Sequence, residues 1–224
     1  MTDARLVTQR RGAAVSATNR VLRNTYLLLS MTLLFSAAMA AVAMTIDVPY
    51  MGLLPMLVAF GILFAIGRFR NSGWGVALVF AFTGLLGFSL GPVLNFYMAT
   101  AGGTQSVVTA ASLTGLIFLS LSGYTLVSKK DFSFMSGFLI TGMWVVIGAI
   151  VLMWLGSFMG FYVSGAQLAI SCAIVVLMSG FILFDTSRII HGGETNYIMA
   201  TVSLYLSIYN LFVSLLRILG AMNR

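Results

Sequence analysis

Residues 197–217 read YIMATVSLYLSIYNLFVSLLR, an apolar run of membrane-spanning length that carries regularly spaced polar residues. Their spacing of 4, 3, 4 and 3 positions places all of them on one face of an α-helix. Polar groups are costly in hydrocarbon unless neighbouring helices satisfy them, so we expect this face to turn toward other helices. It would serve there either as interhelical hydrogen-bonding contacts or as the lining of a solvated path. This polar stripe consists of Ser203, Ser207, Asn210, Ser214 and Arg217.

The composition of the whole chain indicates a membrane protein. Hydrophobic residues make up 60% and charged residues 8% of the 224 residues, whereas a soluble domain has about 25% charged residues. Apolar runs of about 20 residues recur, and this is the length that crosses a hydrocarbon core of about 30 Å. We therefore expect an all-α integral membrane protein embedded in the lipid bilayer.

Seven candidate spans follow from the apolar runs. Their short connections predict one seven-helix transmembrane bundle over residues 24–224, without a separate soluble domain. Residues 1–23 are polar, basic and rich in small residues, and such a segment buries too little apolar surface to fold alone. They are therefore expected to form a tail outside the bundle. The spans cover about 25–46, 51–67, 74–97, 106–127, 133–155, 164–184 and 197–219.

The distribution of Lys and Arg predicts the orientation. The basic residues between spans fall on one side of the membrane if every span crosses, and the opposite loops contain no Lys or Arg. The positive-inside bias then predicts a cytosolic N-terminus and, with seven spans, a C-terminus outside. Arg217 and Arg224 argue against an outside C-terminus, so a re-entrant seventh segment is the alternative. The basic residues of the N-terminal segment and of the loops on the inner side explain the net charge of +7, so it does not indicate nucleic-acid binding. The basic residues are five arginines before residue 24, then Arg68, Arg70, Lys129, Lys130 and Arg188.

Two further residue patterns concern packing within the spans. Gly87 and Gly91 are four residues apart, a spacing that lets helix backbones approach closely. Pro92 follows them directly and predicts a bend in the third span. Cys172, the single cysteine, lies inside an apolar run and is expected to be a small buried residue.

The stretch FDTSRIIHGGE at 184–194 gathers ionisable groups that are scarce elsewhere. Asp185 ends the predicted sixth span near the inner membrane interface, and an acid in that position is a functional candidate. Its partner is either Arg188, one helical turn further on, or an arginine at the end of the second span, Arg68 or Arg70. Two of these pairings would join separate helices, and the pairing with Arg188 would be a local surface bridge.

The rest of this stretch has the features of a connection between helices. His191 is interpreted either as a group that senses pH near neutrality or as a loop residue beside the turn at Gly192 and Gly193. Glu194 before Asn196 has the chemistry of a turn and of a helix start.

The sequence contains no pattern typical of an enzyme, a metal centre or a cofactor site. It has no HExxH motif, and one histidine with one cysteine offers too few ligands for a metal ion. His191 is at least two helical turns from Ser203 or Ser207, too far to activate a serine nucleophile. We therefore expect neither catalysis nor a bound cofactor.

Two segments resemble the signatures of the Bax inhibitor-1 family, also called the transmembrane BAX inhibitor motif family. AFTGLLGFSLGPVLNFY at 81–97 is similar to the family's third helix. FDTSRIIHGGETNYIMATVSLYLSIYNLFVSLLRILG at 184–220 is similar to its sixth and seventh helices. The resemblance covers nearly the whole chain. It implies a fold of seven helices in which the seventh is central and surrounded by the other six.

The resemblance also implies a candidate activity, a slow, pH-sensitive leak of calcium ions (Ca²⁺). Members with this activity use one aspartate at the end of the sixth helix and another within the seventh, with an arginine of the second helix as a latch. Asp185 matches the first aspartate, Arg68 is the best match for the latch and Arg70 the second. Ser207 occupies the position of the second aspartate, so this chain departs from the paired acids of the family.

A second implication comes from a bacterial branch of the family. VLRNTYLLLSMTLLFSA at 21–37 and HGGETNYIMATVSLYLS at 191–207 are its most specific resemblances. Proteins of that branch are inner-membrane modulators of the membrane-anchored ATP-dependent protease FtsH and are also its slow substrates. The resemblance implies that FtsH engages the cytosolic tail at residues 1–23. That tail serves either as this handle or only as a topology signal. Because the second acid is missing, we favour the regulatory role, with the calcium leak as the alternative.

Overall fold

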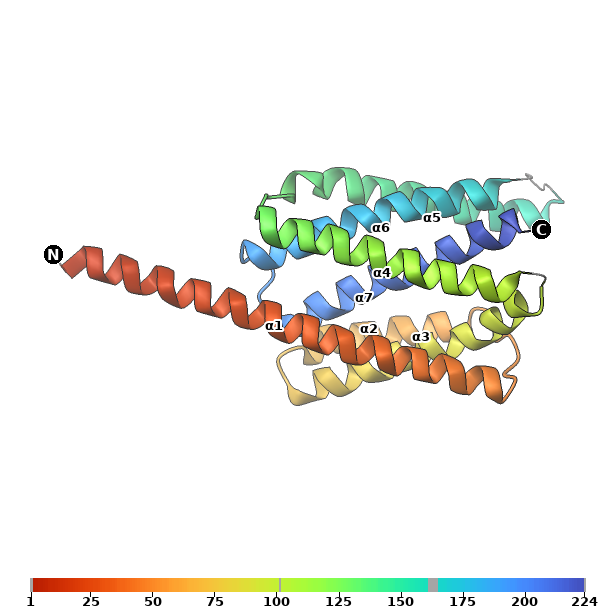
Figure 1. The fold of residues 1–224 in the computed structure, drawn as a ribbon, viewed down its shortest axis with the longest axis horizontal. Coiled ribbons are helices and arrows are strands. Elements are labelled where there is room, and N and C mark those ends of the chain that lie inside the picture. Colours follow the sequence, from red (N-terminus) through yellow and green to blue (C-terminus); the bar gives the residue numbers. More distant parts are fainter. Residues whose placement is uncertain (1, 101, 161–164, 224) are drawn as a thin grey trace. The chain divides into compact units, whose positions relative to one another are not determined.

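Seven α-helices make up nearly all of the chain that the structure describes (Figure 1). The computed structural model describes residues 2–100, 102–160 and 165–223, with side chains from Ser16 onward. The number of helices fits the seven predicted spans. The first residue of the predicted sixth span and part of the loop before it lie outside the described residues. The helices are α1 (Thr2–Thr45), α2 (Leu54–Phe69), α3 (Gly73–Met98), α4 (Gly103–Ser128), α5 (Ser136–Phe158) with the 3-10 helix η1 (Ser133–Met135) before it, α6 (Ala166–Ile190) and α7 (Tyr197–Met222).

Most of these helices are long enough to cross a membrane. Within the described ranges, six are both long and apolar enough, and α2 is the shorter apolar helix. The 16 residues of α2 measure about 24 Å, against about 30 Å for the hydrocarbon core. Pro55 stands in its first turn, where a missing N–H breaks no helical hydrogen bond. The chain is therefore a multi-pass membrane protein with one short helix.

The N-terminal segment differs from its prediction. Residues 1–23 are expected to be a tail unable to fold alone, yet α1 runs without a break from Thr2 to Thr45 (Figure 1). The segment is rich in Ala and Arg, which favour helices, and it extends a helix that the apolar span has already nucleated. At 1.5 Å per residue the 44 residues measure about 66 Å, more than twice the hydrocarbon core. The part of α1 before the spanning segment Ser16–Thr45 is thus helical.

The helices form two compact units. The first comprises Met1–Gly91 and Ser187–Tyr205, and so contains α1, α2, most of α3 and the beginning of α7. The second comprises Pro92–Thr186 and Leu206–Arg224, and so contains α4, α5, most of α6 and the rest of α7. One division falls between Gly91 and Pro92, although α3 continues through the proline as a helix.

Many large apolar side chains are exposed, as lipid contact requires. On α5 only 11% of the most apolar stretch is buried, and Trp144, Leu152 and Phe158 are all exposed. Cys172 on α6 is also exposed, which contradicts its predicted burial. Lipid tails are as apolar as a protein interior, so a small thiol on a membrane helix has no need to be covered by protein.

By contrast, α7 is covered along almost its whole length. Half of its most apolar stretch is buried, against 11–39% for the other five spanning helices of the described chain. No residue from Tyr197 to Leu216 is exposed. Its 26 residues form one uninterrupted helix, which argues against the re-entrant segment that the sequence left open.

Candidate functional site

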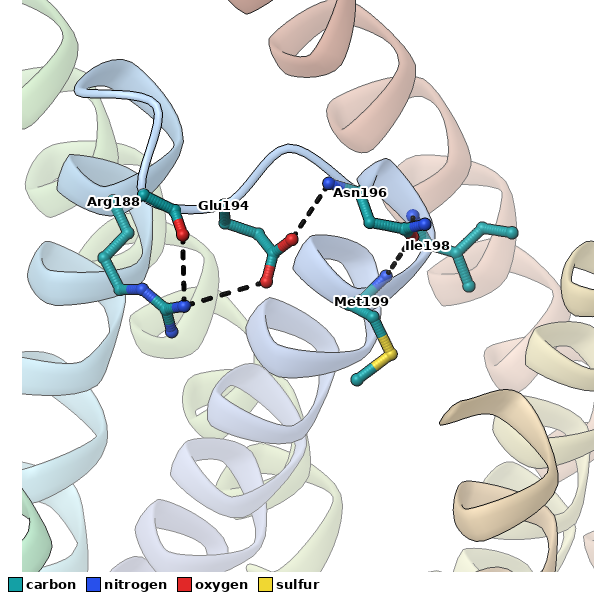
Figure 2. A network of polar contacts seen from close by, with 6 residues as sticks. Arg188, Glu194, Asn196, Ile198 and Met199 are labelled. Atoms are coloured by element: carbon teal, nitrogen blue, oxygen red, sulfur yellow. Dashed lines mark hydrogen bonds and ion pairs between the residues drawn. The ribbon is translucent and has the colours of Figure 1, made fainter. Parts of the chain in front are cut away.

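The α6–α7 junction is a tight turn held by its own residues (Figure 2). The N–H groups of Gly193 and Glu194 donate to the carbonyl oxygen of Arg188 at 2.8 and 3.1 Å. Gly192 has a φ of +75°, a left-handed conformation that favours glycine. Arg188 Nη2 lies 3.8 Å from Glu194 Oε2 and donates to Gly193 O at 3.4 Å. Arg188 therefore contacts the acid of the turn that follows it.

Asn196 joins this junction to the α2–α3 loop. Its Oδ1 accepts hydrogen bonds from the N–H groups of Ile198 and Met199 at 3.0 and 3.1 Å, so it caps the start of α7 (Figure 2). Its Nδ2 donates to Arg70 O at 3.0 Å and to Asn71 Oδ1 at 2.9 Å. The helix-start chemistry predicted here is confirmed, and the main chain of Arg70 takes part in it.

Asp185 lies inside α6 and not at its end. The helix continues for five further residues to Ile190, and the side chain of Asp185 is 6% exposed. The prediction that it ends the helix is wrong. Beyond the polar residues 185–187 the chain continues with Ile189, which is 1% exposed and extends the buried apolar face of the helix. A buried acid in a membrane helix is costly, which marks Asp185 as a functional candidate.

The arginines predicted as partners of Asp185 occupy different surroundings. Arg68 and Arg70 follow one another closely at the end of α2, and both are exposed. Arg188 pairs with Glu194, and its side chain is 38% exposed. A latch between Asp185 and any of these arginines stays a prediction.

His191 is the first residue after α6, and it is exposed. Its Nδ1 lies 2.9 Å from the carbonyl oxygen of Ser187 and 3.3 Å from the hydroxyl of the same residue. The position is that of a loop residue beside the Gly192 turn, and a role in pH sensing stays a prediction.

The polar stripe of α7 is covered by protein at its centre. Ser207 and Ser214 are 4% and 2% exposed, Ser203 and Asn210 are half-buried, and only Arg217 is exposed. Asn210 Nδ2 donates to Leu206 O of its own helix at 2.8 Å. The covered centre agrees with a stripe that faces protein and reaches the surface at its last residue.

A second polar face of α7 makes hydrogen bonds to two other helices of the first unit. The hydroxyl of Tyr205 donates to the carbonyl oxygen of Thr83 on α3 at 3.2 Å, and it lies 2.6 Å from Ser36 Oγ on α1. Thr201 Oγ1 donates to the carbonyl oxygen of Tyr197 in its own helix at 2.7 Å and lies 3.3 Å from the carbonyl oxygen of Thr25 on α1. Tyr205 is 1% exposed, so these bonds form in a region closed to solvent and lipid.

The sequence interpretation missed this second face. Thr201 and Tyr205 lie on roughly the opposite side of α7 from Ser207 and Ser214, at about 100° per residue. A signal for them was present, because a tyrosine hydroxyl in the middle of a span needs a hydrogen-bond partner and Thr201 precedes it by one turn. Polar residues on two opposite faces are what a helix covered on both sides can tolerate.

In the same unit, α1 and α3 pack with their backbones in close contact (Figure 1). A Cβ added at Gly87 would overlap the carbonyl oxygen of Ser36, and one added at Gly91 would lie 2.5 Å from the Cβ of Ala43. The close approach predicted for these two glycines is confirmed, with α1 as the partner helix. We call these contacts between Ser36, Ala43, Gly87 and Gly91, together with the bond from Ser36 to Tyr205, the α1 seam.

The described polar groups form hydrogen bonds that hold neighbouring helices together. Within the described ranges, no three side chains of His, Cys, Asp and Glu gather closely enough to hold a metal ion. The hydroxyls of Thr25 and Thr186 are buried and have no hydrogen-bond partner in the part of the chain that the structure describes.

Known proteins are similar to this chain over nearly its whole length. A family model described as "Inhibitor of apoptosis-promoting Bax1" matches residues 18–224. An uncharacterized membrane protein of Vibrio cholerae is 52% identical over 209 residues, which are 92% of this chain and 91% of that protein. An uncharacterized protein of Pseudomonas aeruginosa is 48% identical over 201 residues, 89% of this chain and 88% of that one. A protein of Escherichia coli K12 named "Modulator of FtsH protease YccA" is 47% identical over 210 residues, 93% of each chain.

Proposed function

This chain belongs to the Bax inhibitor-1 family, and from that membership we propose that it is an inner-membrane modulator of the protease FtsH. The observation that carries the proposal is the end-to-end similarity to a relative that bears this name. That similarity covers 93% of this chain and 93% of the relative.

We propose that this protein acts as a slowly degraded substrate of FtsH. FtsH engages the N-terminal part of α1 on the cytosolic side and withdraws the protein from the membrane slowly. While it is occupied, it degrades other membrane proteins less. The helix before Ser16 supports this proposal because it precedes the spanning segment and is not part of it. The arginines at the predicted inner ends support a cytosolic N-terminus.

We also infer that the six other helices surround α7, as the family resemblance implies. The support is its burial, since no residue from Tyr197 to Leu216 is exposed. Its last turn supports a crossing to the outer side, because Asn223 Nδ2 donates to Ser106 Oγ at the start of α4 at 2.7 Å. The C-terminus is then periplasmic if the N-terminus is cytosolic.

Degradation of a second membrane protein by FtsH tests the proposed function. In proteoliposomes that contain FtsH and a reporter membrane substrate, added wild-type chain should slow the loss of the reporter. The rate should recover as the chain itself is consumed, because the protease then becomes free again. An unrelated polytopic protein of equal helix number, added at the same amount, is the control. A reporter whose rate of loss is the same with and without this chain would exclude the modulator role.

A calcium leak is the second candidate function, and the burial of Asp185 favours it. Ser207, however, cannot share a proton with Asp185 as a second carboxylate would, so the paired gate of the family resemblance cannot form. We therefore expect liposomes with the wild-type chain to admit Ca²⁺ no faster than liposomes with Asp185→Asn, at any pH from 5 to about 8. Faster entry through the wild-type chain than through Asp185→Asn would restore the leak as a function of this protein.

A further inference from the structure

We propose that the α1 seam sets how long FtsH stays occupied by one molecule of this protein. The inference rests on the proposed function, in which the protease pulls from the N-terminus. Because α1 is then the first helix to leave the bundle, the contacts that hold α1 are the first resistance that the protease meets. The strength of the α1 seam, more than the stability of the rest of the bundle, determines the time for which other substrates are spared.

The buried face of α1 is built for close packing. Apart from the adjacent Leu28 and Leu29, the buried residues recur every three or four positions, and those other than the two leucines are small or polar. Small residues let two membrane helices approach until their backbones touch, which increases the dispersion contact between them. The opposite face carries exposed leucines for lipid contact. The buried residues are Thr25, Leu28, Leu29, Thr32, Ser36, Ala40 and Ala43, each less than 9% exposed.

The glycine contacts of α1 involve backbone, which cannot swing aside. At Gly87 the atom that a new side chain would meet is the carbonyl oxygen of Ser36. In the second unit, a Cβ at Gly142 of α5 would lie 2.5 Å from Leu177 Cδ2, which is the movable end of a side chain. The α1 seam therefore has less freedom to adjust than the contact between α5 and α6.

Polar contacts from α7 reach α1 at two points. The hydroxyl of Tyr205 is hydrogen-bonded to Ser36, and the hydroxyl of Thr201, which also donates to Tyr197 of its own helix, lies 3.3 Å from the carbonyl oxygen of Thr25. These positions on α1 are eleven residues apart, about 16 Å along the helix. Withdrawal of α1 toward the cytosol must break both, together with the glycine contacts on α3. Since α7 is the most covered helix, it is a fixed support for these bonds.

The test uses two variants of the α1 seam in the full-length protein. Tyr205→Phe removes one hydroxyl without changing the packed volume, and Gly87→Ala pushes α1 away from α3. We expect FtsH to degrade Tyr205→Phe about threefold faster than wild type. A typical interhelical hydrogen bond in a membrane contributes about 0.6 kcal/mol, and a barrier lowered by that amount gives about a threefold faster rate. Gly87→Ala should be degraded faster still. Both should protect the reporter substrate for a shorter time.

Two alanine substitutions of other glycines are matched controls. Gly61→Ala lies on α2 of the same unit, where nothing lies within 4 Å of the new Cβ, and Gly142→Ala perturbs the α5–α6 contact of the second unit. Both should be degraded at the wild-type rate. If Gly142→Ala is degraded as fast as Gly87→Ala, overall stability sets the occupancy and the α1 seam has no special role.

Failure of this inference can be told apart from failure of the proposed function. If wild type slows reporter degradation and Tyr205→Phe is degraded at the wild-type rate, the α1 seam is not the determinant although the modulator role holds. If wild type is neither degraded by FtsH nor protective, the proposed function itself fails. Tyr205→Phe keeps the test valid even if Gly87→Ala does not accumulate.

Discussion

Replacement of Gly87 by leucine is expected to leave almost no folded protein in the membrane. The new side chain would have to enter the space occupied by the carbonyl oxygen of Ser36, so α1 would have to move as a whole. Overpacking usually costs about 1–3 kcal/mol of folding free energy, and a clash with backbone belongs at or above the upper end of that range. The loss of the hydrogen bond between Ser36 and Tyr205 adds to it. The fraction of detergent-extracted protein that elutes as a single species, and its melting temperature, measure the effect.

Gly61→Leu is the control for this substitution. Gly61 lies on α2 of the same unit, is exposed and has no atom within 4 Å of a new Cβ. A leucine there should contact lipid, and the protein should accumulate and melt as wild type does. If Gly87→Leu also accumulates and melts like wild type, α1 and α3 do not pack backbone to backbone in the membrane.

Removal of residues 2–15 is expected to make the protein resistant to FtsH. The truncated chain keeps the whole spanning segment Ser16–Thr45, so its bundle should fold and insert as before. It lacks the helical segment that we propose the protease engages. We expect its half-life in the presence of FtsH to lengthen about tenfold or more, which corresponds to about 1.4 kcal/mol of lost engagement free energy for each factor of ten. Pulse-chase measurements with and without FtsH give this ratio.

A charge variant separates a protease handle from a topology signal. Changing Arg5, Arg10 and Arg11 to glutamine keeps the length of the segment, while Arg20 and Arg23 still mark the inner side. This variant should be degraded at close to the wild-type rate. Normal degradation of the truncated chain, or equal resistance of the charge variant, would show that the segment is not a handle.

The helices could be predicted from the sequence because membrane crossing imposes a strong and local requirement. An apolar run long enough for the hydrocarbon core has to be helical, so the seven helices occur where the runs are. The ends were harder to predict, because water or an interface tolerates either helix or coil. α6 therefore extends past Asp185 to Ile190, and α1 extends back to Thr2, where composition alone suggested a tail.

The α1 seam could be predicted only in part. The spacing of Gly87 and Gly91 predicted a close helix contact, but a glycine carries no information about its partner, so α1 could not be chosen over any other helix. Tyr205 was hidden in an apolar run because an aromatic residue also suits a lipid-facing position. Only the structure shows that its hydroxyl lies between Ser36 and Thr83.

Two claims depend on the burial of α7: that it holds α1 in place, and that its polar stripe faces protein. The accessibility of single nitroxide labels to oxygen measures this burial most directly. In a chain with Cys172→Ala, one label is placed at Ser207→Cys, which is 4% exposed in wild type, and another at Leu152→Cys on α5, which is 70% exposed. Oxygen dissolves in the bilayer core, so it should broaden the spectrum of the label at 152 strongly and that of the label at 207 only weakly. Equal broadening at the two positions would mean that α7 faces lipid, and neither the stripe nor the support for α1 would then stand.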